Sequence, residues 1–245
     1  MKPIDARAVV QVNDLLTARI YRMELSCPGI AADVSPGQFV HVQVPGYSLR
    51  RPFTVAGADK GCIEVIYRAQ GAGTRTLTQL QPGDEIQVLG PLGRGFEQPR
   101  GPALLLGGGI GTAALLLLAR RLEHSTLVMG GRNADELWLD KLPLPAGTQV
   151  HYVTDDGSRG QQGTVLTVGA SLLAPDMWVG ACGPRPMLRA VQTILHELDI
   201  PGQFALEERM ACGMGACMGC TCTIAAGPAL VCKDGPVFAA QEVKF

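Results

Sequence analysis

Four cysteines near the C-terminus have the type and spacing to hold an iron–sulfur cluster. Cys212, Cys217 and Cys220 form a C-x4-C-x2-C pattern, and Cys232 follows after a gap of eleven residues. Plant-type [2Fe–2S] proteins use this order, with a distant fourth thiolate. The loop is rich in glycine and alanine, so its backbone can wrap closely around a cluster and direct N–H groups at sulfur. An electron carrier needs a donor and an acceptor, so we expect a second redox site elsewhere in the chain.

Zinc is the rival ligand for the same thiols. Four-cysteine zinc sites usually combine two C-x2-C hairpins, whereas three cysteines in this chain lie within nine residues and one stands apart, a spacing that favours iron–sulfur. Cys222 lies two residues beyond Cys220 and could in principle replace it as a ligand. Because Cys220 preserves the C-x2-C step, Cys222 is expected to be a bystander. We expect Met210, Met214 and Met218 to pack around the loop.

Two motifs in the N-terminal half could together bind a pyrophosphate. One is Leu49–Thr54, in which Arg51 could offer a bidentate guanidinium to phosphate at the start of a strand. The other is Gly71–Thr74, a glycine-rich turn before an expected helix over Arg75–Leu80, whose N–H groups could bind the same anion. Each motif alone is typical of an ordinary strand start or turn, so the prediction depends on both.

A glycine-rich run, Gly107–Thr112, lies between a buried strand and a helix in the second half of the chain. A dinucleotide phosphate could approach the helix N-terminus there, with Gly108, Gly109 and Gly111 as candidate contacts. The run is not the G-x-G-x-x-G fingerprint, and close packing of a strand against a helix also requires glycine. The sequence leaves both interpretations open.

Two further strand ends could contact a dinucleotide. Asp155 and Asp156 follow the expected strand Val150–Thr154, where a carboxylate could accept hydrogen bonds from ribose hydroxyls, with an ordinary Asp-Asp-Gly turn as the alternative. Cys182 could line a nicotinamide pocket without being a nucleophile, or it could be a buried inert thiol. No histidine lies in a motif, so we assign no catalytic role to His41, His124, His151 or His196.

The chain shows two patterns of secondary structure around these motifs, and the first covers the residues up to Glu97. Short β-rich runs alternate with Pro-Gly turns in that region, which predicts a small antiparallel barrel. Its strands are expected at Ala8–Val12, Ile20–Leu25, Phe39–Val44, Phe53–Ala56, Ile63–Tyr67 and Glu85–Leu89.

After Pro102 strands alternate with helices, which predicts a Rossmann-like parallel sheet with helices on both faces. Strands are expected at Ala103–Leu106, Thr126–Gly130, Val150–Thr154 and Met177–Gly180, and helices at Thr112–Glu123, Asp135–Lys141, Thr164–Leu173 and Pro186–Leu198. The C-terminal segment has too little apolar sequence for a core of its own, so a metal should hold it together. We therefore expect a multidomain α+β fold, with an antiparallel β-barrel over residues 1–98, a parallel α/β domain over 99–202 and a small [2Fe–2S] domain over 203–245.

Composition excludes some classes of function. The 245 residues carry a formal net charge of -1, which gives no electrostatic footprint for nucleic acid. The first residues contain no apolar signal segment and the cysteines outside the cluster are scattered, so a reducing cytoplasm is expected rather than a disulfide framework. The uncharged stretch Pro102–Ala119 approaches the length of a membrane span, but glycines interrupt it, and no membrane span is expected.

Motifs from most of the chain occur in one order: Arg51–Thr54, Ile66–Arg68, Gly73-Thr74, Leu89–Gly93, Gly107–Gly111, Thr154–Ser158, Cys182–Pro184, Glu207–Gly213 and Cys232–Phe238. In this combination the chain resembles the electron-transfer subunit of NAD-dependent (class 1B) dihydroorotate dehydrogenase, within the ferredoxin reductase superfamily, across essentially its whole length. The last two motifs are the most specific. One departure is Thr112–Ala114, where many relatives have a proline.

The resemblance implies an FAD-binding barrel, an NAD-binding domain and a C-terminal [2Fe–2S] domain. It implies cluster ligands at Cys212, Cys217, Cys220 and Cys232, and FAD contacts at Arg51, Pro52, Phe53, Thr54, Ile66, Tyr67, Arg68, Gly73 and Thr74. It also implies a catalytic partner subunit that carries FMN, in a heterotetramer of two copies of each chain. Electrons from dihydroorotate would then pass from FMN through the cluster and FAD to NAD+ in pyrimidine biosynthesis.

Two other functions stay open at this point. An NAD(P)H:ferredoxin or sulfide oxidoreductase subunit would have the same three modules and a different partner. A non-catalytic interaction module, which belongs to another class, would hold structural zinc at its four cysteines and bind nothing at its glycine turns.

Overall fold

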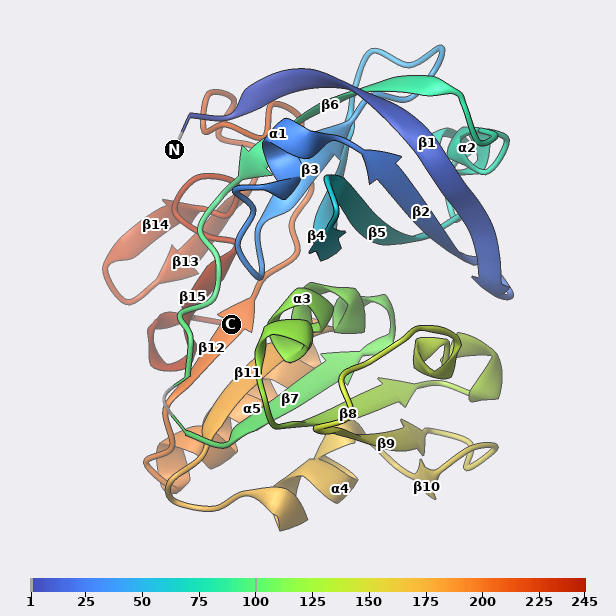
Figure 1. The fold of residues 1–245 in the computed structure, drawn as a ribbon. Coiled ribbons are helices and arrows are strands. Elements are labelled where there is room, and N and C mark those ends of the chain that lie inside the picture. Colours follow the sequence, from blue (N-terminus) through green and yellow to red (C-terminus); the bar gives the residue numbers. More distant parts are fainter. Residues whose placement is uncertain (1, 100) are drawn as a thin grey trace.

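The computed structural model describes residues 2–99 and 101–245 and has two stacked parts (Figure 1). A β-barrel lies above a sheet that has helices on both faces. Helix α3 (Ala113–Arg121) lies between the sheet and the barrel, whereas α4 (Val165–Leu172) and α5 (Arg185–Glu197) cover the opposite face of the sheet. Among the described residues, none of the helices combines the length and the apolar character needed to cross a bilayer.

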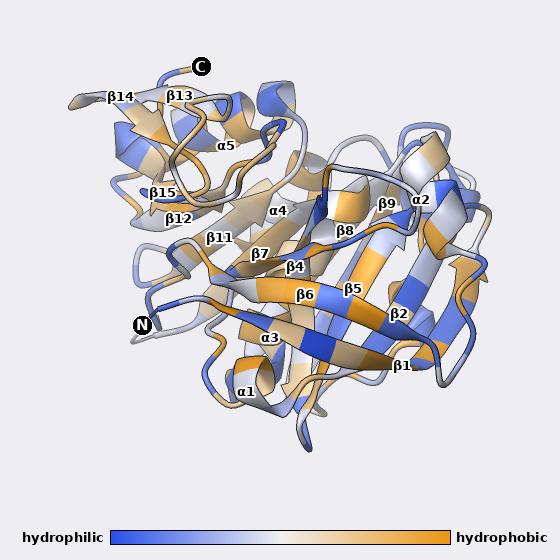
Figure 2. Cartoon of the chain, turned by 90° about the horizontal axis from the view of Figure 1, so that it is seen from above, coloured by the Kyte–Doolittle hydropathy of each residue, from blue (hydrophilic) through white to orange (hydrophobic). Residues whose placement is uncertain are grey.

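Within residues 2–99, six antiparallel strands close into a barrel in the order β1-β2-β5-β4-β3-β6. They are β1 (Ile4–Thr17), β2 (Ile20–Ser26), β3 (Phe39–Val42), β4 (Arg51–Asp59), β5 (Cys62–Arg68) and β6 (Glu85–Leu92). Figure 2 shows hydrophilic and hydrophobic residues alternating along β1, because successive side chains of a strand point to opposite faces. The predicted barrel and each of its predicted strands are confirmed.

Two short helices, α1 (Pro28–Ala31) and α2 (Ala72–Leu77), connect barrel strands. Helix α2 begins before the predicted start at Arg75, because Thr74 caps it. The Thr74 hydroxyl accepts hydrogen bonds from the backbone N–H groups of Gln70 and Gly71, both at 3.1 Å.

Within residues 101–245, seven strands form the second sheet in the order β10-β9-β8-β7-β11-β12-β15. They are β7 (Ala103–Gly108), β8 (Ser125–Gly131), β9 (Thr148–Thr154), β10 (Gln161–Gln162), β11 (Trp178–Cys182), β12 (Gly202–Ala205) and β15 (Val237–Ala239). Every pair is parallel except β12 with β15. The predicted parallel sheet with helices on both faces is confirmed.

The C-terminal segment shares this sheet and its core. Strands β12 and β15 form one edge of the sheet, and buried Phe204, Val231 and Phe238 belong to the same apolar core as residues of β11 and α5. The rest of the segment forms a hairpin of β13 (Thr221–Ile224) and β14 (Gly227–Leu230), followed by a short 3-10 turn, η4 (Ala240–Glu242). The domain boundary at residue 202 stays a prediction, and the sheet continues across it.

The prediction of a helix over Asp135–Lys141 is wrong. The chain forms two 3-10 turns instead, η2 (Ala134–Glu136) and η3 (Leu139–Lys141). The Leu-Trp-Leu run at residues 137–139 is buried at all three positions. The backbone N–H groups of Leu137 and Lys141 bond to the carbonyls of Ala134 and Trp138, both at 3.1 Å and three residues back, which is the pattern of short 3-10 turns and not of a continuous α-helix.

A buried carboxylate joins the barrel to the α/β part. Glu64 of β5 accepts a hydrogen bond from Arg120 Nη1 of α3 at 2.8 Å and another from Arg22 Nε of β2 at 2.5 Å. Gly57 leaves room for this contact, since a Cβ there would lie 2.3 Å from Arg120 Nη1. A buried charge requires paired partners of this kind, and this one fixes α3 against the barrel.

Candidate functional site

The two predicted pyrophosphate motifs lie next to each other. Arg51 begins β4, and its guanidinium lies so close to Gly73 of α2 that a Cβ on that glycine would be 2.7 Å from Nη2. The other end of the guanidinium, Nη1, donates to the carbonyl of Leu49 at 2.7 Å. Residues 52–54 follow along β4 and are half-buried. A cation beside a glycine turn fits the phosphates of a nucleotide.

Thr74 shapes the turn that faces Arg51. Its hydroxyl accepts from two backbone N–H groups and donates to the carbonyl of Gly71 at 3.1 Å, so its hydrogen-bonding groups are used within the cap. The predicted role of Thr74 as an FAD contact remains a prediction.

The predicted contacts on β5 point to two different sides. Tyr67 lies in the barrel core, where its ring stacks on Tyr21 and its hydroxyl donates to Asn13 Oδ1 at 2.9 Å. Burial raises the pKa of Tyr67 above its ordinary value. Ile66 and Arg68 face the α/β part instead. Only the backbone of Tyr67 could therefore reach a cofactor on that side.

Arg68 reaches from the barrel to the glycine run of the α/β part. Its Nη1 lies 3.3 Å from Glu136 Oε1, and its buried Nε has no hydrogen-bond partner within the described part of the chain. Gly109 has a φ of +56°, and Arg68 Nη2 is the nearest group to a Cβ built there, at 3.6 Å. A buried guanidinium N–H that lacks a partner, beside an open glycine turn, fits an anionic ligand such as a nucleotide phosphate.

The other predicted glycines of this run are needed for packing. A Cβ at Gly108 would lie 2.7 Å from Pro184 Cδ, and a Cβ at Gly111 would lie 2.8 Å from the carbonyl oxygen of Cys182. The close-packing interpretation therefore explains Gly108 and Gly111, while Gly109 is the position open to a ligand. The same contacts bring the glycine run against the turn that follows β11.

Asp155 and Asp156 differ in what they contact at the end of β9. Asp156 Oδ1 accepts hydrogen bonds from the backbone N–H of Ser158 at 2.9 Å and from its hydroxyl at 2.6 Å. These bonds lower the pKa of Asp156 and match the turn that was the alternative interpretation. Asp155 is exposed, and its predicted contact with a ribose stays a prediction.

Glu207 begins one of the family motifs named from the sequence, but the sequence analysis gave it no role at the site. Cys182 lies at the end of β11, and Glu207 lies just beyond the end of the neighbouring strand β12. The buried Cys182 thiol donates a hydrogen bond to Glu207 Oε1 at 3.9 Å. Burial first, and then Glu207, raise the pKa of Cys182 well above its ordinary value, so it stays a thiol and not a nucleophile. Glu207 keeps contact with solvent, yet the protein atoms around it raise the pKa of its carboxyl. Its place became visible only with β12, a short strand that the sequence pattern did not indicate.

The cluster cysteines lie in a loop whose backbone N–H groups point at sulfur. Gly215 donates to Cys232 Sγ at 3.1 Å, Ala216 donates to Cys212 Sγ at 3.3 Å, and the N–H of Cys232 donates to Cys220 Sγ at 3.4 Å. Donors of this kind stabilise negative charge on thiolates and on a cluster bound by them. The loop therefore fits the [2Fe–2S] cluster predicted from its spacing.

The cluster thiols lie in different environments. The backbone N–H of Met214 is the main cause that lowers the pKa of Cys212 to about 6, whereas burial raises the pKa of Cys232 to about 12. Cys217 is exposed and Cys220 is buried. Within the described residues, no three His, Cys, Asp or Glu side chains surround one point as ligands of a single metal ion would. A two-iron cluster has another requirement, because each iron takes two of the four thiolates.

Two of the three methionines predicted to pack around the loop are exposed instead. Met214 and Met218 are 53% and 59% exposed, so this prediction is wrong for them, while Met210 is partly buried against the core. Cys222 is buried in β13, opposite Ala229 of β14. Its role as a bystander stays a prediction.

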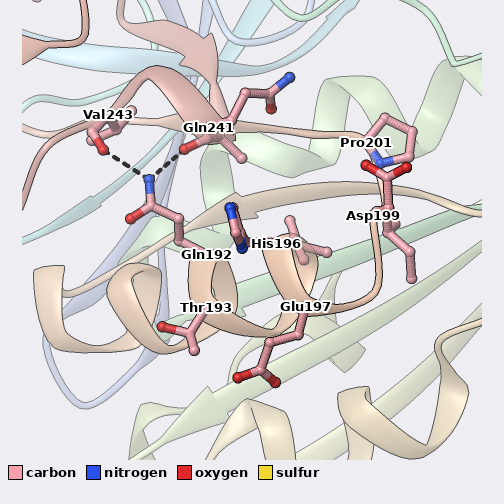
Figure 3. A pocket seen from close by; sticks show the side chains of 11 residues that line it. Gln192, Thr193, His196, Glu197, Asp199, Pro201, Gln241 and Val243 are labelled. Carbon is pink, nitrogen blue, oxygen red and sulfur yellow. Dashed lines mark hydrogen bonds between the residues drawn. The ribbon is translucent and has the colours of Figure 1, made fainter.

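A cavity of about 650 Å³ lies away from all predicted site residues, between the end of α5 and η4 (Figure 3). Figure 3 shows Gln192 of α5, whose Nε2 donates to the carbonyl oxygens of Ala240 at 2.6 Å and Val243 at 2.7 Å. These bonds fasten the C-terminal residues to α5, which gives this region a structural role.

Comparisons with known proteins agree with this geometry. Residues 207–244 match the family model described as the iron–sulfur cluster binding domain of dihydroorotate dehydrogenase B, and residues 10–96 match the oxidoreductase FAD-binding domain. The chain is 36% identical over 245 residues to a dihydroorotate dehydrogenase B (NAD(+)), electron transfer subunit, of Caldanaerobacter subterraneus subsp. tengcongensis, with 98% of each chain covered. It is 40% identical over 254 residues to the protein of the same name from Bacillus caldolyticus, with 97% of each chain covered.

A solved structure is similar over nearly the same length. It belongs to an NADH-dependent reduced ferredoxin-NADP oxidoreductase studied for flavin-based electron bifurcation. The TM-score is 0.86 at 26% identity, and the match covers 98% of this chain and 90% of that one.

Proposed function

Since the chain belongs to the family of electron transfer subunits of NAD(+)-dependent dihydroorotate dehydrogenase B, we propose that it carries electrons from a dihydroorotate-oxidising catalytic subunit to NAD+. Its resident carriers are a [2Fe–2S] cluster and FAD. It is thus an oxidoreductase subunit, and its own residues position carriers rather than act as acids or bases on a substrate.

One observation supports this order of carriers above the others. Strand β4, which carries the predicted FAD motif Arg51–Thr54 and is called the flavin strand here, lies between the cluster loop and the glycine run. Strand β4, which begins with Arg51, pairs with β3 on one side and β5 on the other. His41 of β3 contacts Gly213 of the cluster loop, and Arg68 of β5 reaches Gly109 of the glycine run. A flavin held on β4 would therefore have the cluster on one side and a nicotinamide nucleotide on the other.

The chain's own residues divide the work of binding. Arg51 with the α2 turn would hold the flavin phosphates, and Arg68 with Gly109 would hold the dinucleotide phosphate. Cys182, kept as a neutral thiol, would line the nicotinamide side without reacting. FAD, when bound, supplies the chemistry that joins the two ends, because a flavin can exchange electrons singly with iron–sulfur and in pairs with a nicotinamide.

We further propose that the catalytic subunit carries FMN, docks over the cluster loop, and assembles with this chain as a heterotetramer of two copies of each. The exposure of Cys217, Met214 and Met218 supports docking there, because a ligand of the cluster lies at that surface and exposed methionines suit a protein interface. None of the eight cysteines forms a disulfide, which supports a reducing cytoplasm as the compartment.

A second candidate function is an NAD(P)H:ferredoxin oxidoreductase subunit. The similarity to the NADH-dependent reduced ferredoxin-NADP oxidoreductase, over almost the whole of both chains, favours keeping this candidate. The higher identity to the dihydroorotate dehydrogenase subunits favours the first.

The test is reconstitution with each electron source. The chain is co-expressed with the dihydroorotate dehydrogenase catalytic subunit encoded in the same genome, and NAD+ reduction is followed with dihydroorotate or with reduced ferredoxin. We expect NADH to form with dihydroorotate only when both subunits are present, and not with the Cys217→Ser variant. If NADH forms with reduced ferredoxin but not with dihydroorotate, the chain is an NAD(P)H:ferredoxin oxidoreductase subunit instead.

A further inference from the structure

His41 lies where the barrel meets the cluster loop. It belongs to β3, is 1% exposed, and packs its imidazole against Gly213, the residue after Cys212. A Cβ on Gly213 would lie 2.7 Å from Cε1 and 2.8 Å from Nε2 of the ring. Gly213 also has a φ of +71°, a conformation that favours glycine. The loop therefore rests directly on this imidazole.

The Nε2 atom of His41 has no hydrogen-bond partner within residues 2–99 and 101–245. Buried polar atoms are nearly always hydrogen-bonded, because an unpaired one loses its bonds to water without replacement. Burial, with a smaller effect of Arg50, lowers the pKa of His41 to about 4. The ring is therefore neutral at pH 7, with one N–H donor. This nitrogen needs a partner that the described chain does not supply.

A cluster held by the neighbouring cysteines would supply acceptors of the right kind. Cluster sulfurs accept hydrogen bonds, and such bonds help to set the reduction potential. The loop already directs the N–H groups of Gly215 and Ala216 at cysteine sulfurs from its own side. His41 would add a donor from the barrel.

The position of His41 also connects the cluster to the flavin strand. Across the β3–β4 pair, His41 lies opposite Pro52, within the predicted FAD motif. One side chain therefore separates the flavin strand from the residue next to a cluster ligand. This placement explains why a polar side chain is buried at this point of an otherwise apolar strand, in which all four residues are buried.

We propose that the Nε2–H of His41 donates a hydrogen bond to a sulfur of the [2Fe–2S] cluster. This bond raises the reduction potential of the cluster relative to that of FAD. This inference rests on the proposed function, because it requires an iron–sulfur cluster at the four cysteines. The hydrogen bond stabilises the reduced cluster more than the oxidised one, since reduction adds negative charge.

The first test uses the native protein and needs no substitution that could disturb folding. The holoprotein is prepared with ¹⁵N-labelled histidine, the cluster is reduced, and pulsed EPR is recorded. We expect a weak ¹⁵N coupling from a single histidine, which disappears in His41→Gln although the other three histidines stay labelled. A normal cluster signal without histidine coupling overturns this inference and leaves the proposed function intact. The absence of any cluster signal overturns both.

The second test compares His41→Leu with His41→Gln by redox titration of cluster and flavin. Both replacements approximate the size of the ring, but only glutamine keeps an N–H donor. In the leucine variant we expect the equilibrium share of electrons on the cluster to fall about tenfold relative to FAD, equal to about 59 mV for a one-electron couple. The glutamine variant should recover most of this shift. Equal potentials in the native protein and His41→Leu, or equal shifts in both variants, overturn the inference.

Discussion

On the side that faces the α/β part, the barrel is joined by charged side chains, whereas on the side that faces the cluster it is joined by backbone atoms and glycines. Glu64 holds Arg120 of α3 on the first side, and Arg68 holds Glu136. On the second side the N–H of Arg94 donates to the carbonyl of Gly235 at 2.5 Å, and Gly213 rests on His41. The same barrel therefore uses two kinds of contact for its two neighbours.

The two interfaces should tolerate different kinds of substitution. A buried ion pair is directional, and removing one partner leaves the other charge buried without compensation. A glycine contact depends on space, so it fails when a Cβ is added rather than when a charge is removed. We therefore expect charge-neutralising substitutions to weaken the first interface, and small increases in volume to weaken the second.

The largest effect should come from removing a cluster ligand. Cys212→Ser should abolish the cluster absorbance, the bound iron and electron transfer to the catalytic subunit, because serine cannot replace the thiolate that the cluster requires. FAD content should stay near its native level, since the flavin motif belongs to the barrel. Iron, sulfide and flavin analysis of the purified protein measures both.

Cys222→Ser is the matched control for that substitution. Cys222 lies in β13, outside the N–H···S bonds of the loop, so this variant should keep its iron. Loss of iron in Cys222→Ser but not in Cys220→Ser would exchange the roles of these two cysteines.

The charged interface should be most sensitive at Glu64. Glu64→Ala leaves Arg120 and Arg22 without their shared carboxylate, and the loss of one partner of a buried ion pair costs about 3–5 kcal/mol of the free energy of unfolding. Glu85→Ala is the control, because it removes an exposed pair with Arg7 and should cost less than about 1 kcal/mol. Urea unfolding measures both variants, and similar losses would show that the interface does not depend on the buried charge.

The glycine interface should be most sensitive at Gly213. Gly213→Ala combines a strained φ with a clash against His41, for which we expect a loss of about 2–4 kcal/mol. Gly83→Ala is the matched control: Gly83 also has a positive φ, +97°, but nothing lies within 4 Å of a Cβ there. Its loss should be about 1–2 kcal/mol, from the backbone alone. Equal melting temperatures for the two variants would mean that the His41 contact adds nothing.

Arg51 lies at neither interface and tests whether the barrel alone holds the flavin. Arg51→Ala should weaken FAD binding about 10- to 100-fold, since a charge-assisted hydrogen bond contributes about 1.5–3 kcal/mol. Arg50→Ala, which removes a pair with Asp5 at 2.7 Å, is the neighbouring control and should bind FAD normally. Fluorescence titration of apoprotein with FAD measures the dissociation constants, and undiminished affinity in Arg51→Ala would remove this residue from the site.

The parts of the fold that local pattern decides were predictable from the sequence. Alternating side chains and Pro-Gly turns identified the barrel strands, and the cysteine spacing identified the loop whose N–H groups point at sulfur. The pairing of β12 with β15 was not predictable, because these short strands are separated by more than thirty residues and have no pattern of their own. The contact of Glu207 with Cys182 was not predicted for the same reason.

The glycine run shows a second limit of the sequence. Gly108, Gly109 and Gly111 look equivalent in a motif, yet two of them are required by contacts with the turn after β11 and only Gly109 faces an arginine. These roles depend on the packing of segments that are distant in sequence. Likewise, nothing near His41 in the sequence indicates that Gly213 lies on its ring.

The smallest expected effect concerns Glu207, which lies in the chain between strand β12 and the cluster loop. Its pKa is raised above the ordinary 4.5, mainly because the protein atoms packed around the carboxyl disfavour its charged form, so between the two pKa values the folded protein keeps a proton that the unfolded chain has lost. The stability contribution is therefore complete below the ordinary carboxyl pKa and is lost as the pH rises through the higher folded value. Solvent reaches Glu207, so we expect the loss to stay below about 1 kcal/mol. The side chain in Glu207→Gln cannot ionise. The melting temperature of this variant should therefore rise relative to that of the native protein as the pH increases from 4.5 toward neutrality. Parallel curves for the two proteins across this range would show that the carboxylate is fully compensated in the fold.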